Sequence, residues 1–199
     1  TSKADIVVLG EGEETIVELV DALEAGRSLA EIDGLAFHDR DHERIIVNKR
    51  RMRMTEIDSL APPAWDLFDL KIYHDHRYEG CMHSASLSVP ILATRGCPYQ
   101  CTYCSSANMW TLRWIPRDPI KVVNEIEGYM RKYGAGNFPL QDLTAIIKKD
   151  WIVTFCKEIL RRQLKIVWQL PVGTRVESVD DEVAILLHES GMINMAYAP

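Results

Sequence analysis

The most constraining feature of this 199-residue sequence is a group of three closely spaced cysteines, Cys97, Cys101 and Cys104, in the stretch TRGCPYQCTYCSS. The spacing Cys-x-x-x-Cys-x-x-Cys places three thiols within eight residues. The sequence shows no basic start followed by a long apolar stretch, so we expect no secretory signal and reduced thiols. Clustered reduced cysteines indicate a metal centre rather than disulfides.

Two kinds of metal centre are compatible with three thiols in one loop. Structural zinc usually takes four protein ligands, and the fourth would have to be Cys81, His74, His76 or His83, none of which has a convincing spacing. A cubane iron–sulfur cluster held by three thiolates leaves one iron open for a substrate or cofactor. The pattern therefore favours an iron–sulfur cluster, with zinc as the alternative.

From residue 87 onward, short apolar strands alternate with amphipathic helices. Strands are predicted at SVPILA, NFPLQDL, KIVWQL and INMAYA. Helices are predicted around residues 122–130, at 150–162 with Asp150 as N-cap, and at 180–190 before Gly191. This alternation indicates parallel βα units, about half of a barrel. The cysteines directly follow the first strand, and barrel chemistry takes place at the C-terminal ends of strands.

The N-terminal part has a different pattern. An apolar run at residues 6–9 predicts a buried strand, followed by a helix that ends at Gly26 and has apolar side chains at Ile16, Leu19, Val20 and Leu23. The stretches IDGLAFHD and ERIIVNKR predict a β-hairpin that turns at Arg40 and Asp41. Residues 57–70 are irregular and contain prolines, and residues 72–86 show no clear periodicity.

The stretch CPYQCTYC, with the strand and the Arg-Gly pair before it, resembles the signature of the radical S-adenosylmethionine (SAM) family. The resemblance implies that Cys97, Cys101 and Cys104 bind a 4Fe–4S cluster, whose open iron holds the amino and carboxylate groups of SAM. It places Tyr103 near the adenine. In this family, an electron from the cluster cleaves SAM to methionine and a 5′-deoxyadenosyl radical, which abstracts hydrogen from the substrate.

Three stretches before the cysteines, DIVVLGEGEETIVELV, IDGLAF and LAPPAWDLFDL, extend the resemblance to the cobalamin-binding subfamily of radical SAM proteins. The resemblance implies an α/β fragment of a longer enzyme, inactive in isolation. Residues 1–30 are then the C-terminal end of a Rossmann-like cobalamin-binding domain, and residues 31–86 are a β-hairpin and linker. Residues 87–199 form the N-terminal half of a radical SAM (β/α)6-type partial barrel.

The resemblance also suggests cofactor-binding residues outside the cysteine loop. Gly10, Glu11 and Gly12 match the family's loop near the cobalamin tail, although the cobalamin-ligand motif Asp-x-His-x-x-Gly is absent. Asp142 occupies the strand end where the family holds the SAM amino group, and Arg175 follows the next strand as a candidate for the SAM carboxylate. A polar strand cap for Asp142 and an exposed loop arginine for Arg175 are the alternative interpretations.

Other residues have more ordinary interpretations. Arg117 in WIPRDP matches a recurrent arginine of the family, with surface ion pairing as the preferred interpretation. Cys156 lies on an apolar helix face and is predicted to be a core thiol. His74 and His76 are predicted to be surface residues rather than ligands.

The net charge of −6 gives no electrostatic reason to expect nucleic acid as a partner, and no apolar run is long enough to span a membrane. The resemblance implies a cytoplasmic enzyme that acts on a small molecule and takes electrons from a donor such as flavodoxin or ferredoxin. The predicted reaction is reductive cleavage of SAM, coupled to cobalamin-dependent methyl transfer or oxidative cyclisation. A non-catalytic iron–sulfur or zinc-binding protein is the alternative.

Overall fold

The computed structural model describes residues 4–198, which divide into two compact units at residue 55. The first unit contains β1 (Ile6–Val8), α1 (Glu13–Glu24), β2 (Leu35–Asp39) and β3 (Arg44–Val47). The three strands form an antiparallel sheet in the order β1-β2-β3. The predicted helix and the predicted hairpin, with its turn at residues 40–43, are therefore confirmed.

The predicted burial of the first unit is wrong. Val7 in the middle of β1 is 44% exposed, and Ile16, Val20 and Leu23 of α1 are each about half exposed, at 48%, 45% and 56%. The small core consists instead of Leu19, Ala22, Ile32 and Leu35. Three short strands cover only one side of α1, so the wider apolar face expected from periodicity is not buried within this unit.

The hairpin packs in the same compact unit as β1 and α1. The Asn48 side chain donates to the carbonyls of Leu29 and Ile32 at 2.7 and 2.8 Å, and the Leu9 amide donates to the Gly34 carbonyl at 2.7 Å. The bond from Asn48 to Leu29 and the bond from Leu9 to Gly34 cross the boundary predicted at residue 30. The assignment of residues 1–30 to a cobalamin-binding domain and of 31–86 to a linker stays a prediction, because compactness does not test domain membership.

The second unit is built on a parallel sheet, with β6 (Asn137–Pro139), β7 (Val167–Arg175) and β8 (Met192–Ala198) in that order. Residues 88–91 extend the sheet beyond β6 through two parallel bridges. The amides of Val89 and Ile91 each donate to β6 at 2.9 Å, and Pro90, which has no N–H, lies between them and removes no bond to β6. All four predicted strands are thus present in parallel order.

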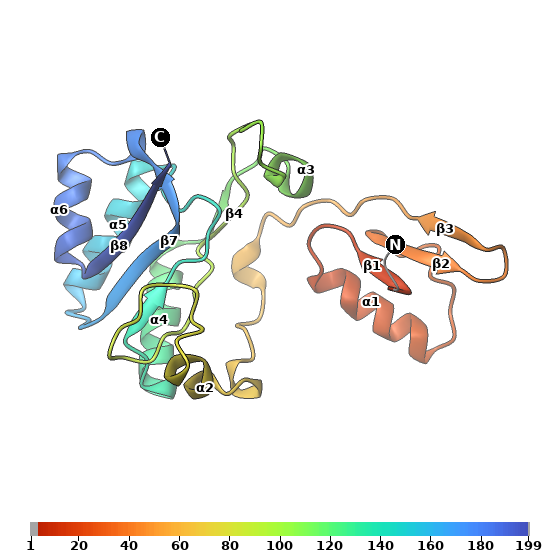
Figure 1. The fold of residues 1–199 in the computed structure, drawn as a ribbon, viewed down its shortest axis with the longest axis horizontal. Helices are drawn as coiled ribbons and strands as arrows, with labels where there is room; N and C mark the ends of the chain where they lie inside the picture. The colour runs from red at the N-terminus through yellow and green to blue at the C-terminus, as the bar shows by residue number, and fades with distance from the viewer. Residues whose placement is uncertain (1–3, 199) are drawn as a thin grey trace. The chain divides into compact units, whose positions relative to one another are not determined.

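Three helices, α4 (Pro119–Tyr133), α5 (Lys149–Arg161) and α6 (Asp181–Glu189), pack side by side over one face of this sheet (Figure 1). The core between these layers includes the fully buried residues Ile126, Phe138, Ile152, Phe155, Trp168, Leu170 and Leu187. Each helix therefore returns the chain to the start of the next parallel strand, which places the loops after the strands at one end of the sheet.

The helix ends follow local sequence. Asp118 and Asp180 cap α4 and α6 by accepting backbone N–H bonds, and Gly134 ends α4 in the left-handed conformation. The prediction of Asp150 as the N-cap of α5 is wrong, because Lys148 is at that position and Asp150 lies in the first turn. There its negative charge is still favourable towards the helix dipole.

The remaining elements of the second unit are short. Three are 3-10 turns, at Ile57–Ser59, Trp65–Leu67 and Val176–Ser178. The others are two short helices, α2 (Leu70–Asp75) and α3 (Ser106–Trp110), and two short strands, β4 (Thr94–Arg95) and β5 (Ile115–Pro116). Within residues 4–198, no helix has the length and apolar character needed to cross a membrane. Cys156 is fully buried in the core, as predicted.

Candidate functional site

The three predicted metal-binding cysteines lie in one excursion of the chain beyond the sheet. β4 and β5 pair antiparallel, with Thr94 opposite Pro116 and Arg95 opposite Ile115. The intervening residues 96–114 contain the cysteines and α3 (Figure 1). We call residues 96–114 the cysteine loop. Because β4 and β5 join its two ends, the position of the loop is fixed by the strand that precedes it.

A glycine is required where the chain enters this loop. Gly96 has a φ of +86°, in the left-handed region that residues with a side chain rarely adopt. Further along the loop, a bond from the Cys104 amide to the Cys101 carbonyl at 3.0 Å closes a turn. The Arg-Gly pair before the first cysteine thus has a conformational cause.

The three thiols differ in environment. Cys97 and Cys101 are partly buried, Cys104 is exposed, and all three are free thiols. Burial raises the pKa of Cys97, and the neighbouring sulfurs of Cys101 and Cys104 raise it further. Hydrogen bonds with the hydroxyl and the backbone amide of Ser106 lower the pKa of Cys104. Cys104 therefore ionises more easily than Cys97.

This donor set fits an iron–sulfur cluster. Thiolates are the soft ligands that iron–sulfur clusters and zinc prefer. Three free thiols on one loop, with Cys104 open to solvent, leave an approach for a bulky cluster. A cluster held by one segment of the chain needs three thiolates from it, and the cysteine loop supplies three.

Arg175, the candidate partner of the SAM carboxylate, approaches the cysteine loop. It is the last residue of β7, and its guanidinium lies over the Tyr99 ring at 4.7 Å from the ring centroid. Its positive charge interacts with the sulfurs of Cys97 and Cys101. Glu177 also pairs with Arg175, at 3.1 Å. The sequence analysis missed Tyr99, whose position inside the Cys-x-x-x-Cys spacing was the available signal.

Asp142 lies after β6 and is almost completely buried, at 1% exposure. Its carboxylate accepts backbone N–H bonds from Ala93, at 3.3 Å, and from Thr94. Both carboxylate oxygens are therefore used by the residues that lead into the cysteine loop. The geometry is that of a cap joining the end of β6 to the start of β4.

Burial raises the pKa of Asp142 to about 6. The folded chain then holds a proton more tightly than the unfolded chain, so stability should fall as pH rises from about 4 to about 6 and level off above. We expect Asp142→Asn to remove this contribution. Urea unfolding of both chains between these pH values checks the prediction, and parallel pH profiles would contradict it.

The other predicted cofactor-binding residues lie at an exposed position of the cysteine loop and in a turn of the first unit. Tyr103 is 88% exposed. Gly10, Glu11 and Gly12 form the turn between β1 and α1, where the Glu11 carboxylate accepts the Met54 amide at 2.6 Å. The Glu11 side chain is only 7% exposed, and within this unit it binds Arg53 and Met54, which follow the hairpin.

Arg117, which follows β5, forms ion pairs with Asp58 at 2.9 Å and with Glu125 at 2.6 Å. Its guanidinium also donates to the Leu92 carbonyl at 3.1 Å. The predicted ion pairing is confirmed, although Arg117 is mostly buried rather than on the open surface. It holds the segment before the cysteine loop against α4 and the irregular residues around 58.

The fold is that of cobalamin-dependent radical SAM enzymes. The chain matches the structure of the radical SAM methyltransferase TsrM of Kitasatospora setae, determined with tryptophan substrate and a SAM analog, with a TM-score of 0.73. The match covers 98% of this chain and 37% of TsrM, at 19% sequence identity. It matches the cobalamin-dependent enzyme OxsB, determined with aqua-cobalamin and SAM, with a TM-score of 0.72 over 97% of this chain and 27% of that one, at 18% identity.

Among curated proteins, the chain is 34% identical to the anaerobic magnesium-protoporphyrin IX monomethyl ester cyclase of Cereibacter sphaeroides, over 96% of this chain and 31% of the relative. The chain thus spans about a third of the length of the curated cyclases that it matches. No protein-family model matches it. The resemblance to the cobalamin-binding subfamily of radical SAM proteins, stated from the sequence, is confirmed.

Proposed function

We propose that this chain is the cluster-binding part of a radical SAM enzyme that catalyses cobalamin-dependent methyl transfer or oxidative cyclisation. The observation that carries the proposal is the position of Cys97, Cys101 and Cys104 in one loop, closed by β4 and β5, directly after the first strand of a parallel sheet. The curated relatives, which are named as cyclases and methyltransferases, support both reaction types.

In the proposed site the three cysteines hold a 4Fe–4S cluster through their thiolates. A bound cluster supplies the electron that cleaves SAM to methionine and a 5′-deoxyadenosyl radical. Ser106 favours the thiolate form of Cys104. Asp142 acts as a positioning residue, because it fixes the backbone of Ala93 and Thr94 before the loop. A SAM contact by Asp142 would have to share oxygens that already accept these amides.

Arg175 is the proposed partner of the SAM carboxylate, because its guanidinium lies beside the cysteine loop and a guanidinium can donate two parallel hydrogen bonds to a carboxylate. Tyr99 supports the guanidinium through its ring face. Tyr103 is proposed to contact the adenine, for which its exposed ring is available. In the full-length protein, Gly10, Glu11 and Gly12 are proposed to border a cobalamin tail, with residues 87–199 as half of the SAM barrel.

Anaerobic reconstitution tests the proposal. We expect four irons and four sulfides per chain, and an electron paramagnetic resonance (EPR) signal of the reduced cluster that changes when SAM is added. A cluster that is insensitive to SAM would instead indicate an electron-transfer or structural role. Stoichiometric zinc without sulfide would indicate the zinc-binding alternative.

Replacing Arg175 with Ala should weaken SAM binding while leaving the iron content unchanged. A charge-assisted hydrogen bond contributes about 1.5–3 kcal/mol, so we expect a loss of roughly 10- to 100-fold in SAM affinity. The measurement is a SAM titration of the reduced EPR signal. Arg161→Ala is the control, since Arg161 is exposed and pairs only with Glu158 among the described contacts. Equal affinity in the two variants would contradict the assignment.

A further inference from the structure

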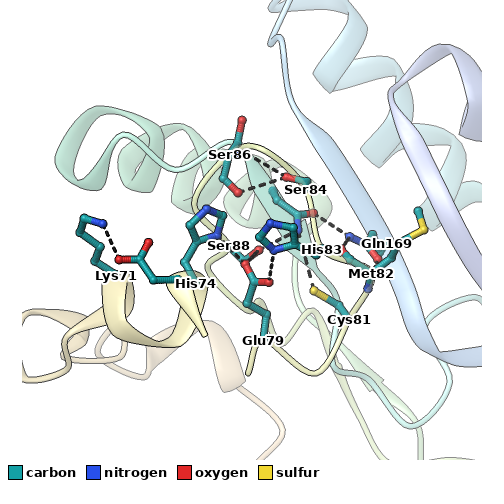
Figure 2. A network of polar contacts seen from close by, with 12 residues as sticks. Lys71, His74, Glu79, Cys81, Met82, His83, Ser84, Ser86, Ser88 and Gln169 are labelled. Atoms are coloured by element: carbon teal, nitrogen blue, oxygen red, sulfur yellow. Dashed lines mark hydrogen bonds and ion pairs between the residues drawn. The ribbon is translucent and has the colours of Figure 1, made fainter. Parts of the chain in front are cut away.

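Two histidines and one glutamate from the segment without clear periodicity converge beside the parallel sheet. His74 is on α2, and Glu79 and His83 follow it in the connection to the first strand (Figure 2). The Nδ1 atoms of His74 and His83 lie 2.7 and 2.9 Å from the two carboxylate oxygens of Glu79. We call these three residues the His-Glu-His cluster. The prediction that His74 is a surface residue without ligand chemistry needs revision on this geometry.

From this geometry we propose that the His-Glu-His cluster binds one divalent transition-metal ion of the zinc type. One ligand atom from each residue lies within 4.8 Å of the other two. Around an ion with metal–ligand bonds of roughly 2 Å, such atoms are at most about 4 Å apart. Small side-chain rotations therefore suffice to bring all three onto one ion.

The donor types suit such an ion. Two imidazole nitrogens and one carboxylate oxygen form a set that zinc uses with one position left for water. Each neutral histidine can move its ring proton from Nδ1 to Nε2, which frees the Nδ1 lone pair for the metal. No proton has to leave the site. The ion then replaces two hydrogen bonds to one carboxylate with three metal–ligand bonds.

The charge of the cluster also favours a cation. The Glu79 side chain is only 4% exposed. Its carboxylate contacts both imidazole rings and accepts the Ser88 hydroxyl, so three polar groups surround it in a largely buried position. The two imidazole rings are 4.9 Å apart, a separation at which two positive rings repel. A single divalent ion neutralises Glu79 without that repulsion.

Residues of the parallel sheet form hydrogen bonds that lead to Glu79. The Ser88 hydroxyl donates to Glu79 at 2.7 Å, and the buried Asn137 amide donates to Ser88 at 2.7 Å. The buried Gln169 amide donates to Asn137 at 2.9 Å and also bonds to the backbone of Met82 (Figure 2). Outer partners of this kind orient metal ligands.

These contacts place the ion between two parts of the second unit. His74 belongs to α2, and the supporting residues belong to the first strand, β6 and β7. An ion held by the cluster would thus fasten residues 70–83 to the barrel sheet.

The test must separate this site from the cysteine loop, which also binds metals. We would replace Cys97, Cys101 and Cys104 with Ser in the full chain and titrate it with Co²⁺. The expected result is one Co²⁺ per chain, displaced by Zn²⁺, with ligand-field bands and no thiolate charge-transfer band. Since this chain cannot bind the cluster, the result is independent of the proposed enzymatic function.

His83→Gln should weaken Co²⁺ binding at least about 100-fold, because one of three ligands is lost. The matched control is His76→Gln, since His76 is exposed, stacks on Tyr78 and lies outside the cluster. Ser88→Ala retains the three ligands and should weaken binding roughly 10- to 100-fold. Circular dichroism checks the folding of each variant. If His83→Gln does not fold, Ser88→Ala carries the comparison.

Three outcomes would overturn the proposal. The first is that Co²⁺ binds to the folded parent chain no more tightly than to a His74→Gln, His83→Gln double variant. The second is that the His76 and His83 variants lose equal Co²⁺ affinity. The third is a thiolate charge-transfer band, which would show that Cys81 binds the ion. If the parent chain itself does not fold, zinc counted per chain in the wild-type protein after cluster assembly replaces the titration. Less than one zinc there, after incubation with Zn²⁺, overturns the proposal equally.

Discussion

Replacing Cys101 with Ala is expected to abolish assembly of the 4Fe–4S cluster. Cys101 is the middle thiol of the loop, and its backbone carbonyl also accepts the amide of Cys104. Two remaining thiolates cannot hold three irons of a cubane, so the expected content is close to zero iron and sulfide per chain. The measurement is iron and sulfide analysis after anaerobic reconstitution.

The control for this experiment is Cys156→Ala. Cys156 is fully buried on α5, and burial raises the pKa of its thiol to about 11, so it is a core residue and a poor ligand. We expect the control to assemble the full cluster. Full iron content in the Cys101 variant would show that the three cysteines do not act together.

Replacing Gly191 with Ala is expected to cause the largest loss of folding stability among single-methyl changes in the second unit. Gly191 has a φ of +93°, and an added Cβ would overlap the Ile166 carbonyl oxygen. The left-handed conformation costs about 1–2 kcal/mol. Overpacking against backbone adds about 1–3 kcal/mol. The sum predicts a loss of roughly 2–5 kcal/mol in the free energy of unfolding, measured by urea denaturation.

Gly134→Ala separates the two contributions. Gly134 also has a left-handed φ, of +66°, but an added Cβ would meet no atom within 4 Å. We therefore expect Gly134→Ala to cost only the conformational part, about 1–2 kcal/mol. If both variants lost equal stability, contact with Ile166 would contribute nothing at Gly191.

The barrel part of the fold was predictable because its elements are strongly periodic. Val122 and Ile126 at helical spacing predicted α4, and both are fully buried. The run around Trp168 predicted β7, in which Trp168, Gln169 and Leu170 are also buried. Such patterns depend only on which side of an element faces the core. Asp150 failed as an N-cap because an N-cap depends on where the backbone enters the helix, and side-chain type alone does not determine that.

The contacts around the candidate sites were less predictable. The three cysteines were recognisable by spacing, but the contact of Arg175 with Tyr99 joins residues 76 positions apart, and local patterns contain no information about it. The His-Glu-His cluster was missed because its segment has no periodicity, and the sheet residues Asn137 and Gln169 determine how it folds back. Asp142 was predicted to be either a SAM contact or a polar strand cap, and its bonds to Ala93 and Thr94 require the parallel register.

The antiparallel pairing of β4 with β5 has a consequence for the order of assembly. The two-residue ladder closes the cysteine loop with backbone bonds alone. The hydrophobic core lies among α4, α5, α6 and the parallel sheet and includes none of the three cysteines. In a zinc finger, by contrast, metal binding and folding are a single event. The proposed iron–sulfur cluster would instead lie outside this core, so core packing would not depend on iron, and iron could be inserted after the core has formed.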